Sequence, residues 1–203
     1  MIQFAHGFTK MTIIDFESWI KTIDVQREVL TIQLHHTWRP NYSYFKRQNH
    51  FDLQIAMRNY HVNNNGWDDV GQHFTIFPDG IILTGRSLNS NPAGIFGFNK
   101  NSVCIENVGN FDKGCDEMTP LHQDAVVKLT AILCKKFSVP IHSDKIVYHH
   151  WFDIATGNRN DGLGVNNKSC PGTNFFGGNA VYDCEQNFLP LVVSALNDDL
   201  DIR

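Results

Sequence analysis

Short runs of apolar and β-branched residues recur along the chain and predict five β-strands. The runs cover residues 28–34, 73–77, 81–84, 102–108 and 146–149. Runs of this kind, bounded by turn-forming residues, are typical of strands in a sheet. Between the second and third runs, Pro78-Asp79-Gly80 predicts a turn, because proline fixes φ and glycine accepts a positive φ. We therefore expect these two strands to form a hairpin.

Apolar residues at helical spacing predict four helices between and around the strands. They cover residues 15–23, 51–62, 120–137 and 187–196. Asp15 is the expected N-cap of the first helix, and Thr119 with Pro120 suits the N-cap and first residue of the third. Pro190 is compatible with the last helix because it falls in the first turn.

The length and composition favour one compact unit. The 203 residues are 42% hydrophobic, which is enough to bury one core, so we expect a single domain. Residues 88–100 have no period and predict a surface loop. Residues 153–167 hold three glycines and four asparagines and predict a long flexible loop.

The charge distribution excludes some classes of partner. The formal net charge is −4 and there is no block of Lys or Arg, so we expect neither nucleic acid nor a membrane as partner. No apolar stretch approaches the roughly 18 residues of a membrane span, and residues 1–10 do not resemble a signal peptide. We expect a soluble monomer without a secretion signal.

The five cysteines lack the dense spacing of a disulfide scaffold. Cys104 lies in a strand pattern and Cys134 in a helical pattern, so both are expected to be core thiols. Cys115 and Cys184 remain a possible pair if the protein acts outside a cell.

Three separate segments carry side chains that suit a catalytic zinc. His35 and His36 close one apolar run, His149 and His150 close another, and Cys170 lies in the Lys-Ser-Cys-Pro-Gly run of residues 168–172. Two histidines and one cysteine leave the fourth tetrahedral position for a water. A single histidine pair is weak evidence, because histidines at strand ends more often have a structural role.

Five strings occur in an order that is more specific than any one of them. They are LHHT at 34–37, NYHVNNNGWDDVGQHFTIFPDG at 59–80, GR at 85–86, SVCIENVGNF at 102–111 and HH…KSCPG at 149–172. Together they resemble the zinc N-acetylmuramoyl-L-alanine amidases, which share a fold with the animal peptidoglycan recognition proteins and with phage amidase lysozymes. The resemblance spans about residues 28 to 175.

The resemblance implies a fold and a metal site. The fold is a single α/β domain with a central mixed β-sheet flanked by helices, and Zn²⁺ lies in a surface groove. His35, His149 and Cys170 match the three zinc ligands. The expected division is an N-terminal helical extension at 1–27, the amidase domain at 28–175, and a C-terminal helical extension at 176–203 that packs on the same domain.

The resemblance also implies catalytic roles. Glu106 matches a glutamate that serves as general base and then protonates the leaving amine, and Lys168 matches a lysine that stabilises the oxyanion. Alternatives remain, namely a Glu106 salt bridge to Arg86 and a solvated Lys168. Contacts to sugar or peptide are expected from His36, Trp38, Arg86 and His150.

The sequence departs from the family pattern at two places. Gln72 occupies the position of a tyrosine that assists catalysis in the phage amidases, and a glutamine cannot transfer a proton. The loop at 150–169 is longer than the usual spacer and offers Asp153 as a rival ligand to Cys170. His61, His73, His122 and His142 match no ligand position and are expected to be structural or exposed.

The implied function is hydrolysis of the amide between the lactyl group of N-acetylmuramic acid and the first L-alanine of the peptidoglycan stem peptide. The expected setting is a phage or prophage lysin that is made in the cytoplasm and reaches the cell wall after release, and an effector or a cytosolic recycling enzyme is the alternative setting. The alternative is a module that recognises muropeptides without cutting them.

Overall fold

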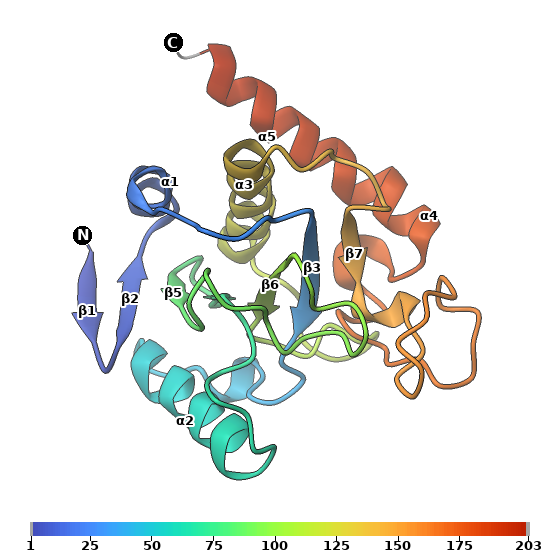
Figure 1. Cartoon of the computed structure of the whole chain (residues 1–203), viewed down its shortest axis with the longest axis horizontal. Coiled ribbons are helices and arrows are strands. Elements are labelled where there is room, and N and C mark those ends of the chain that lie inside the picture. Colours follow the sequence, from blue (N-terminus) through green and yellow to red (C-terminus); the bar gives the residue numbers. More distant parts are fainter. Residues whose placement is uncertain (1, 202–203) are drawn as a thin grey trace.

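The computed structural model describes residues 2–201, and a seven-stranded mixed sheet forms its centre (Figure 1). The strand order is β1-β2-β5-β4-β6-β3-β7. The strands are β1 Gln3–Ala5, β2 Phe8–Met11, β3 Thr31–His36, β4 Phe74–Ile76, β5 Ile82–Thr84, β6 Ser102–Asn107 and β7 Ile146–Tyr148. A single α/β domain with a central mixed sheet was predicted, and the structure confirms it.

The parallel part of the sheet places the chemistry-bearing residues in one row. Strands β4, β6, β3 and β7 are mutually parallel, so their carboxyl ends lie at one edge. In this register His35 on β3 lies beside Glu106 on β6, and Glu106 lies beside Thr75 on β4. Paired residues on neighbouring strands point to the same face of a sheet. The row therefore faces one side of the molecule.

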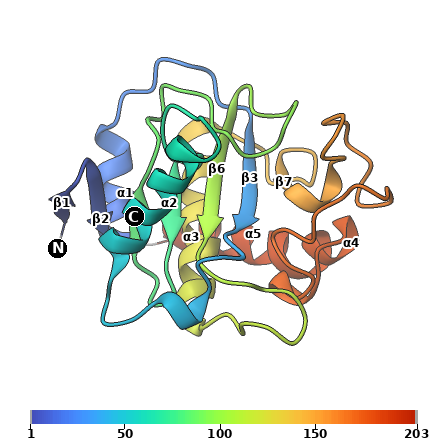
Figure 2. The same ribbon diagram turned by 90° about the horizontal axis from the view of Figure 1, so that it is seen from below.

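Helices cover the two faces of the sheet unequally (Figures 1 and 2). Helices α1 (Ile13–Thr22), α3 (Pro120–Phe137) and α5 (Leu189–Asp201) lie on one face, and α2 (His50–Asn63) lies on the other. The larger apolar core fills the first side, where Trp151, Tyr148 and Phe175 are almost fully buried. A smaller core lies beneath α2 and includes Leu53 and Met57. The row of residues that includes His35 and Glu106 faces α2.

The N-terminal segment differs from the predicted helical extension. Residues 3–11 form a β-hairpin, β1–β2, and β2 pairs with β5 so that the sheet gains two strands. These strands are three and four residues long, too short for alternation to identify them in the sequence. The N-cap of α1 is Thr12, and Asp15 is the third helical residue of a reciprocal capping box with it.

The C-terminal helix also begins earlier than predicted. Helical structure starts at Val181 with α4 (Val181–Asp183), continues through a π-helical turn at Cys184–Phe188, and becomes α5 at Leu189. In the π turn, the Leu189 N–H donates to the Cys184 carbonyl. The next residue, Pro190, has no N–H and cannot donate a helical hydrogen bond. The change from the α-helical to the π-helical hydrogen-bond pattern therefore occurs directly before this proline.

The cysteines are all free thiols, which corrects the possible Cys115–Cys184 pair. Cys184 packs in the core on the π turn, whereas Cys115 is exposed. Cys104 and Cys134 are buried, as predicted.

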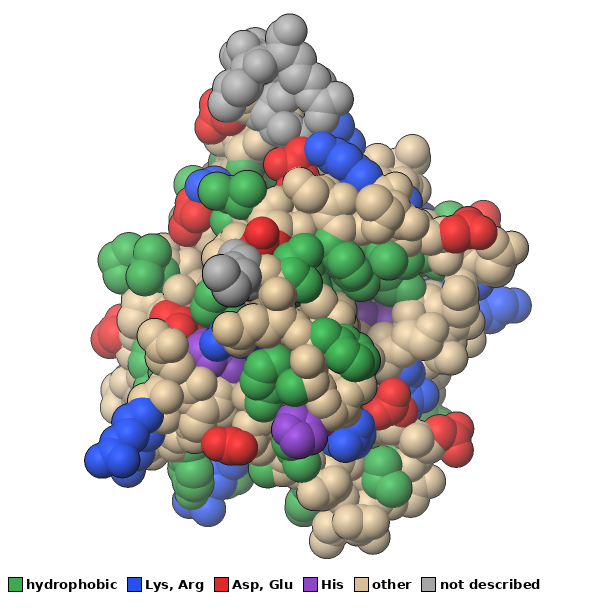
Figure 3. Space-filling model, turned by 90° about the vertical axis from the view of Figure 1, so that its left-hand side faces the viewer, with side chains coloured by type: hydrophobic (Ala, Val, Ile, Leu, Met, Phe, Trp, Pro, Cys, Tyr) green, Lys and Arg blue, Asp and Glu red, His purple; other side chains and the backbone are tan. Residues whose placement is uncertain are grey.

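The molecular surface shows no concentration of one charge on the face that Figure 3 presents. Basic and acidic side chains of the described residues are interspersed there with hydrophobic ones. Among the described residues, no helix has the length and apolarity needed to cross a bilayer.

Two buried histidines give the fold a specific sensitivity to acid. His73 Nδ1 accepts the Cys104 N–H and its Nε2 donates to the Ser90 carbonyl, and His122 lies between the Tyr42 hydroxyl and Asn107 Oδ1. Both imidazoles are therefore held neutral. Burial lowers the pKa of each of these two histidines to about 3.

We expect stability to fall as the pH drops below 6.5, because the unfolded chain then binds protons that the folded protein excludes. Each of the two histidines contributes about 1 kcal/mol of this loss between pH 7 and 5.5. Urea unfolding of the wild type and of His122→Gln across this interval measures the effect. The variant should lose stability less steeply, and an unchanged slope would contradict the assignment.

Candidate active site

Three side chains from separate segments converge beside the carboxyl ends of β3 and β7. His35 is the penultimate residue of β3, His149 is the first residue after β7, and Cys170 lies in the loop that precedes η3 (Phe175–Gly177). His149 Nδ1 is 3.2 Å from His35 Nδ1, and Cys170 Sγ is 3.6 Å from the same His35 nitrogen. All three ligand atoms lie within 4.8 Å of one another. This spacing suits a single metal ion.

The protonation state of the two histidines also suits a metal. Burial lowers the pKa of His149 to about 3 and that of His35 well below its ordinary value, so both imidazoles are neutral. Burial raises the pKa of the Cys170 thiol. The backbone N–H of His36 points at Cys170 Sγ at 3.4 Å and would favour the thiolate that a metal requires.

Glu106 lies on β6 directly beside His35 and is partly exposed to the space in front of the sheet. Burial raises the pKa of Glu106 to about 8, and the positive charge of Lys168 opposes that shift. The alternative salt bridge to Arg86 is absent among the described residues. The Arg86 guanidinium instead donates to the carbonyls of Val70, Asp69 and Asn91.

A cavity of about 840 Å³ opens in front of these residues. Its floor includes His35, Glu106 and Cys170, and α2 forms one wall. Lys168 and Trp38 also line the cavity, and Trp38 is 54% exposed. Other lining residues are Thr37, Arg39, Pro40, Tyr44, Leu53, Ala56, Met57, Tyr60, His61, Asn65, Trp67, Gln72, Ala93, Gly94, His149 and Ser169.

The other predicted contact residues occupy different surroundings. His36 also borders the cavity, but its ring packs against Phe111 and its Nδ1 accepts the Phe111 N–H. Neither Arg86 nor His150 is among the lining residues, and His150 Nδ1 instead contacts the Lys168 carbonyl at 2.6 Å. The roles of Arg86 and His150 in substrate binding remain predictions. In the structure, both side chains contact backbone carbonyls of loops.

The rival ligand Asp153 lies apart from the site. Its carboxylate accepts hydrogen bonds from Ala155 and Thr156 and so stabilises its own turn. The cluster of His35 and His149 includes Cys170 and does not include Asp153, so Cys170 is the better candidate for the third ligand.

Sequence reasoning missed most of the wall that α2 contributes. Tyr60, His61 and Trp67 line the cavity from α2 and the turn after it. Nothing in the periodicity of this segment separates residues that face a cavity from residues that face the core. Gln72, which departs from the family pattern, also lies at the cavity. Its Nε2 donates to Thr75 Oγ1, and its Oε1 has no hydrogen-bond partner among the described residues.

The model of the N-acetylmuramoyl-L-alanine amidase family matches residues 25–173, most of the chain. The chain belongs to this family. Peptidoglycan-recognition protein SC1a of Drosophila melanogaster is 34% identical over 79 residues, which are 39% of this chain and 42% of that protein. The match thus spans about two fifths of that relative.

Solved structures of two other proteins share the fold. Drosophila PGRP-LB superposes with a TM-score of 0.60 at 23% identity, over 81% of this chain and 84% of that one. The N-acetylmuramoyl-L-alanine amidase LysC from Clostridium intestinale gives a TM-score of 0.54 at 21% identity, over 84% and 86% of the two chains. At these identities the likeness concerns the fold.

Proposed function

We propose that this amidase family member is a zinc hydrolase that cleaves the amide between the lactyl group of N-acetylmuramic acid and L-alanine in peptidoglycan. The observation that carries the proposal is the convergence of His35, His149 and Cys170 beside Glu106 on the floor of one cavity. A site with three donors and a neighbouring proton carrier is the arrangement of a hydrolytic metal centre.

The donor set fits zinc. Two imidazole nitrogens and one thiolate are ligands that zinc binds well, and three protein donors would leave one coordination position for a water. When bound there, zinc would lower the pKa of a coordinated water and polarise the carbonyl of the substrate.

The chain's own residues supply the proton transfers. In its ionised form, which the positive charge of Lys168 favours against the effect of burial, Glu106 would accept a proton from the attacking water as the oxygen–carbon bond to the lactyl carbonyl forms. The same carboxyl group would then donate that proton to the alanine nitrogen as the carbon–nitrogen bond breaks, which yields a carboxylic acid and a free amino terminus. The acid then loses its proton to the amine or to solvent. Lys168 at the cavity would stabilise the negative charge that develops on the carbonyl oxygen.

Related structures support a peptidoglycan fragment as the ligand. A Drosophila PGRP-LB variant with the same fold and a TM-score of 0.60 was solved in complex with tracheal cytotoxin. A module that only recognises such fragments is the second candidate, and the family match is compatible with both. The complete set of three donors favours hydrolysis, because binding alone has no need of it. As setting, we propose wall degradation by a phage or prophage lysin.

Digestion of purified peptidoglycan by the zinc-loaded protein tests the proposal. We expect new L-alanine amino termini, quantified by mass spectrometry, with one zinc ion per chain. A zinc-loaded protein that binds the polymer and releases no alanine termini would favour the recognition module instead.

A further inference from the structure

Gln33 contacts the ligand histidine on the side away from the other two ligands. It lies on β3 two residues before His35, so both side chains point to the same face of the sheet. Gln33 Oε1 is 3.3 Å from His35 Nε2, whereas His35 Nδ1 is the nitrogen that approaches His149 and Cys170. The two ring nitrogens of His35 thus have separate partners.

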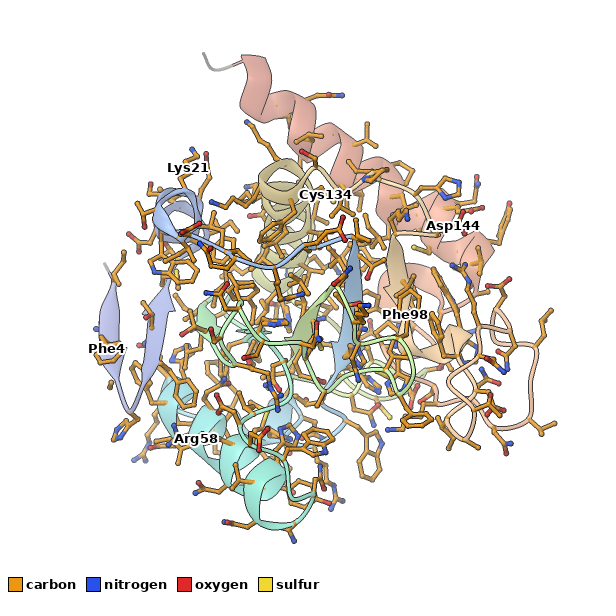
Figure 4. The ribbon with its side chains drawn as sticks, in the orientation of Figure 1. Phe4, Lys21, Arg58, Phe98, Cys134 and Asp144 are labelled. Atoms are coloured by element: carbon orange, nitrogen blue, oxygen red, sulfur yellow. The ribbon has the colours of Figure 1, made fainter. Side chains whose placement is uncertain are left out.

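The orientation of the Gln33 amide is fixed by the loop that covers it. Gln33 Nε2 donates to the Phe98 carbonyl at 2.9 Å, so the amide oxygen is the atom left to face His35. Figure 4 labels Phe98, which lies near β3 and β7 in that view. Gln33 is completely buried, which denies both atoms a competing water. Because a carbonyl oxygen can only accept, the proton of the neutral His35 ring must lie on Nε2.

Gly94 closes the remaining side of this pair. A Cβ at this position would clash with Gln33 Oε1 and would reach His35 Nε2 and Cys104 Sγ at 3.1 Å. The backbone therefore lies directly against the hydrogen-bonded pair. Asn99 Oδ1 accepts the N–H groups of Gly94 and Ile95 and so holds this part of the loop in place.

The tautomer matters because His35 has a second set of possible partners. His35, Cys104 and Glu106 also have ligand atoms within 4.8 Å of one another. Cys104 is the register partner of Gln33, and its sulfur and His35 Nε2 both lie against Gly94. A proton on Nε2 prevents that nitrogen from binding a metal and leaves Nδ1 free for the set with His149 and Cys170.

We propose that Gln33 is a positioning residue that holds the His35 proton on Nε2 and so directs Nδ1 to the zinc site. This inference rests on the proposed function for the identity of the metal. Partners of this kind, which orient a ligand histidine through its second nitrogen, commonly change metal affinity by about 10- to 100-fold when they are removed.

Zinc affinity of the full chain, measured by competition with a chromophoric chelator, tests the proposal. We expect Gln33→Met to weaken zinc binding by about 10- to 100-fold. Gln54→Met is the matched control, because Gln54 is equally buried and its Nε2 also donates to a backbone carbonyl, that of Thr84, yet it lies outside the cavity lining. We expect the control to bind zinc as the wild type does.

A second measurement needs no variant. Nitrogen-15 chemical shifts of the imidazole rings in the zinc-free wild type report which nitrogen of His35 carries the proton, and we expect Nε2. A proton on Nδ1, or a Gln33→Met variant with wild-type zinc affinity, would overturn the proposal.

The two proposals fail in different ways. A chain that binds zinc in a Gln33-dependent manner but releases no L-alanine from peptidoglycan refutes the proposed function and retains the role of Gln33. A chain that releases L-alanine, and whose zinc affinity does not depend on Gln33, supports the proposed function and refutes the role of Gln33. A wild type that binds no zinc overturns both.

Discussion

Replacing Cys170 by alanine should abolish both zinc binding and hydrolysis. The two remaining ligands, His35 and His149, cannot hold the ion in a site built for three donors. Loss of the metal removes several kcal/mol of charge stabilisation in the transition state, so we expect the rate of L-alanine release to fall by about 10³-fold or more. Metal analysis of the purified variant and the peptidoglycan assay measure the two effects together.

The control for this variant is another buried thiol. Cys134 on α3 is 3% exposed, compared with 6% for Cys170, and it lies in the main core away from the cavity. Cys134→Ala should keep its zinc and its activity in the folded protein. If Cys170→Ala retains stoichiometric zinc, the ligand assignment is wrong.

Replacing Glu106 by glutamine should stop hydrolysis while zinc stays bound. The amide has the shape of the carboxyl group but cannot accept and return a proton, so we expect activity to fall by about 10²- to 10⁴-fold. Glu106 is not a member of the His35–His149–Cys170 set, and the zinc content should therefore remain that of the wild type. Initial rates of L-alanine release together with metal analysis separate this result from the effect of Cys170→Ala.

Glu28→Gln provides a comparison for the Glu106 variant. Glu28 lies just before β3, outside the cavity lining, and its carboxylate accepts a hydrogen bond from Asn101. Its substitution should leave the rate unchanged. An active Glu106→Gln protein would assign the proton transfers to a different group.

The strands that carry the site could be predicted because each is a run of apolar residues with strong β propensity. The segments 102–108 and 146–149 agree with β6 and β7 to within a residue. The strand predicted at 28–34 begins three residues later and ends two residues later in the structure, so His35 and His36 belong to the strand itself. This shift matters, because alternation along a strand sends neighbouring residues to opposite faces.

Other features depend on contacts that a sequence pattern does not record. The predicted loop at 88–100 buries Ile95 and presses Gly94 against His35, although nothing in its composition marks it as part of the site. The α2 wall of the cavity has the same hydrophobic spacing as a helix packed on a core. Ordered motifs therefore identify the ligands more readily than they identify the surroundings that shape the cavity.

Because β3 carries two adjacent histidines, zinc binding should depend on the register in which this strand pairs with its neighbours. His35 points to the cavity face of the sheet, whereas the ring of His36 packs against Phe111 and accepts its N–H, so that His36 only borders the cavity. A slip of one residue that brings His36 to the place of His35 would also bring Leu34 to the place of Gln33. The slipped strand would still present a histidine, but that histidine would lack the amide partner that fixes its tautomer. Tight zinc binding would thus distinguish a correctly paired sheet from one that is merely compact.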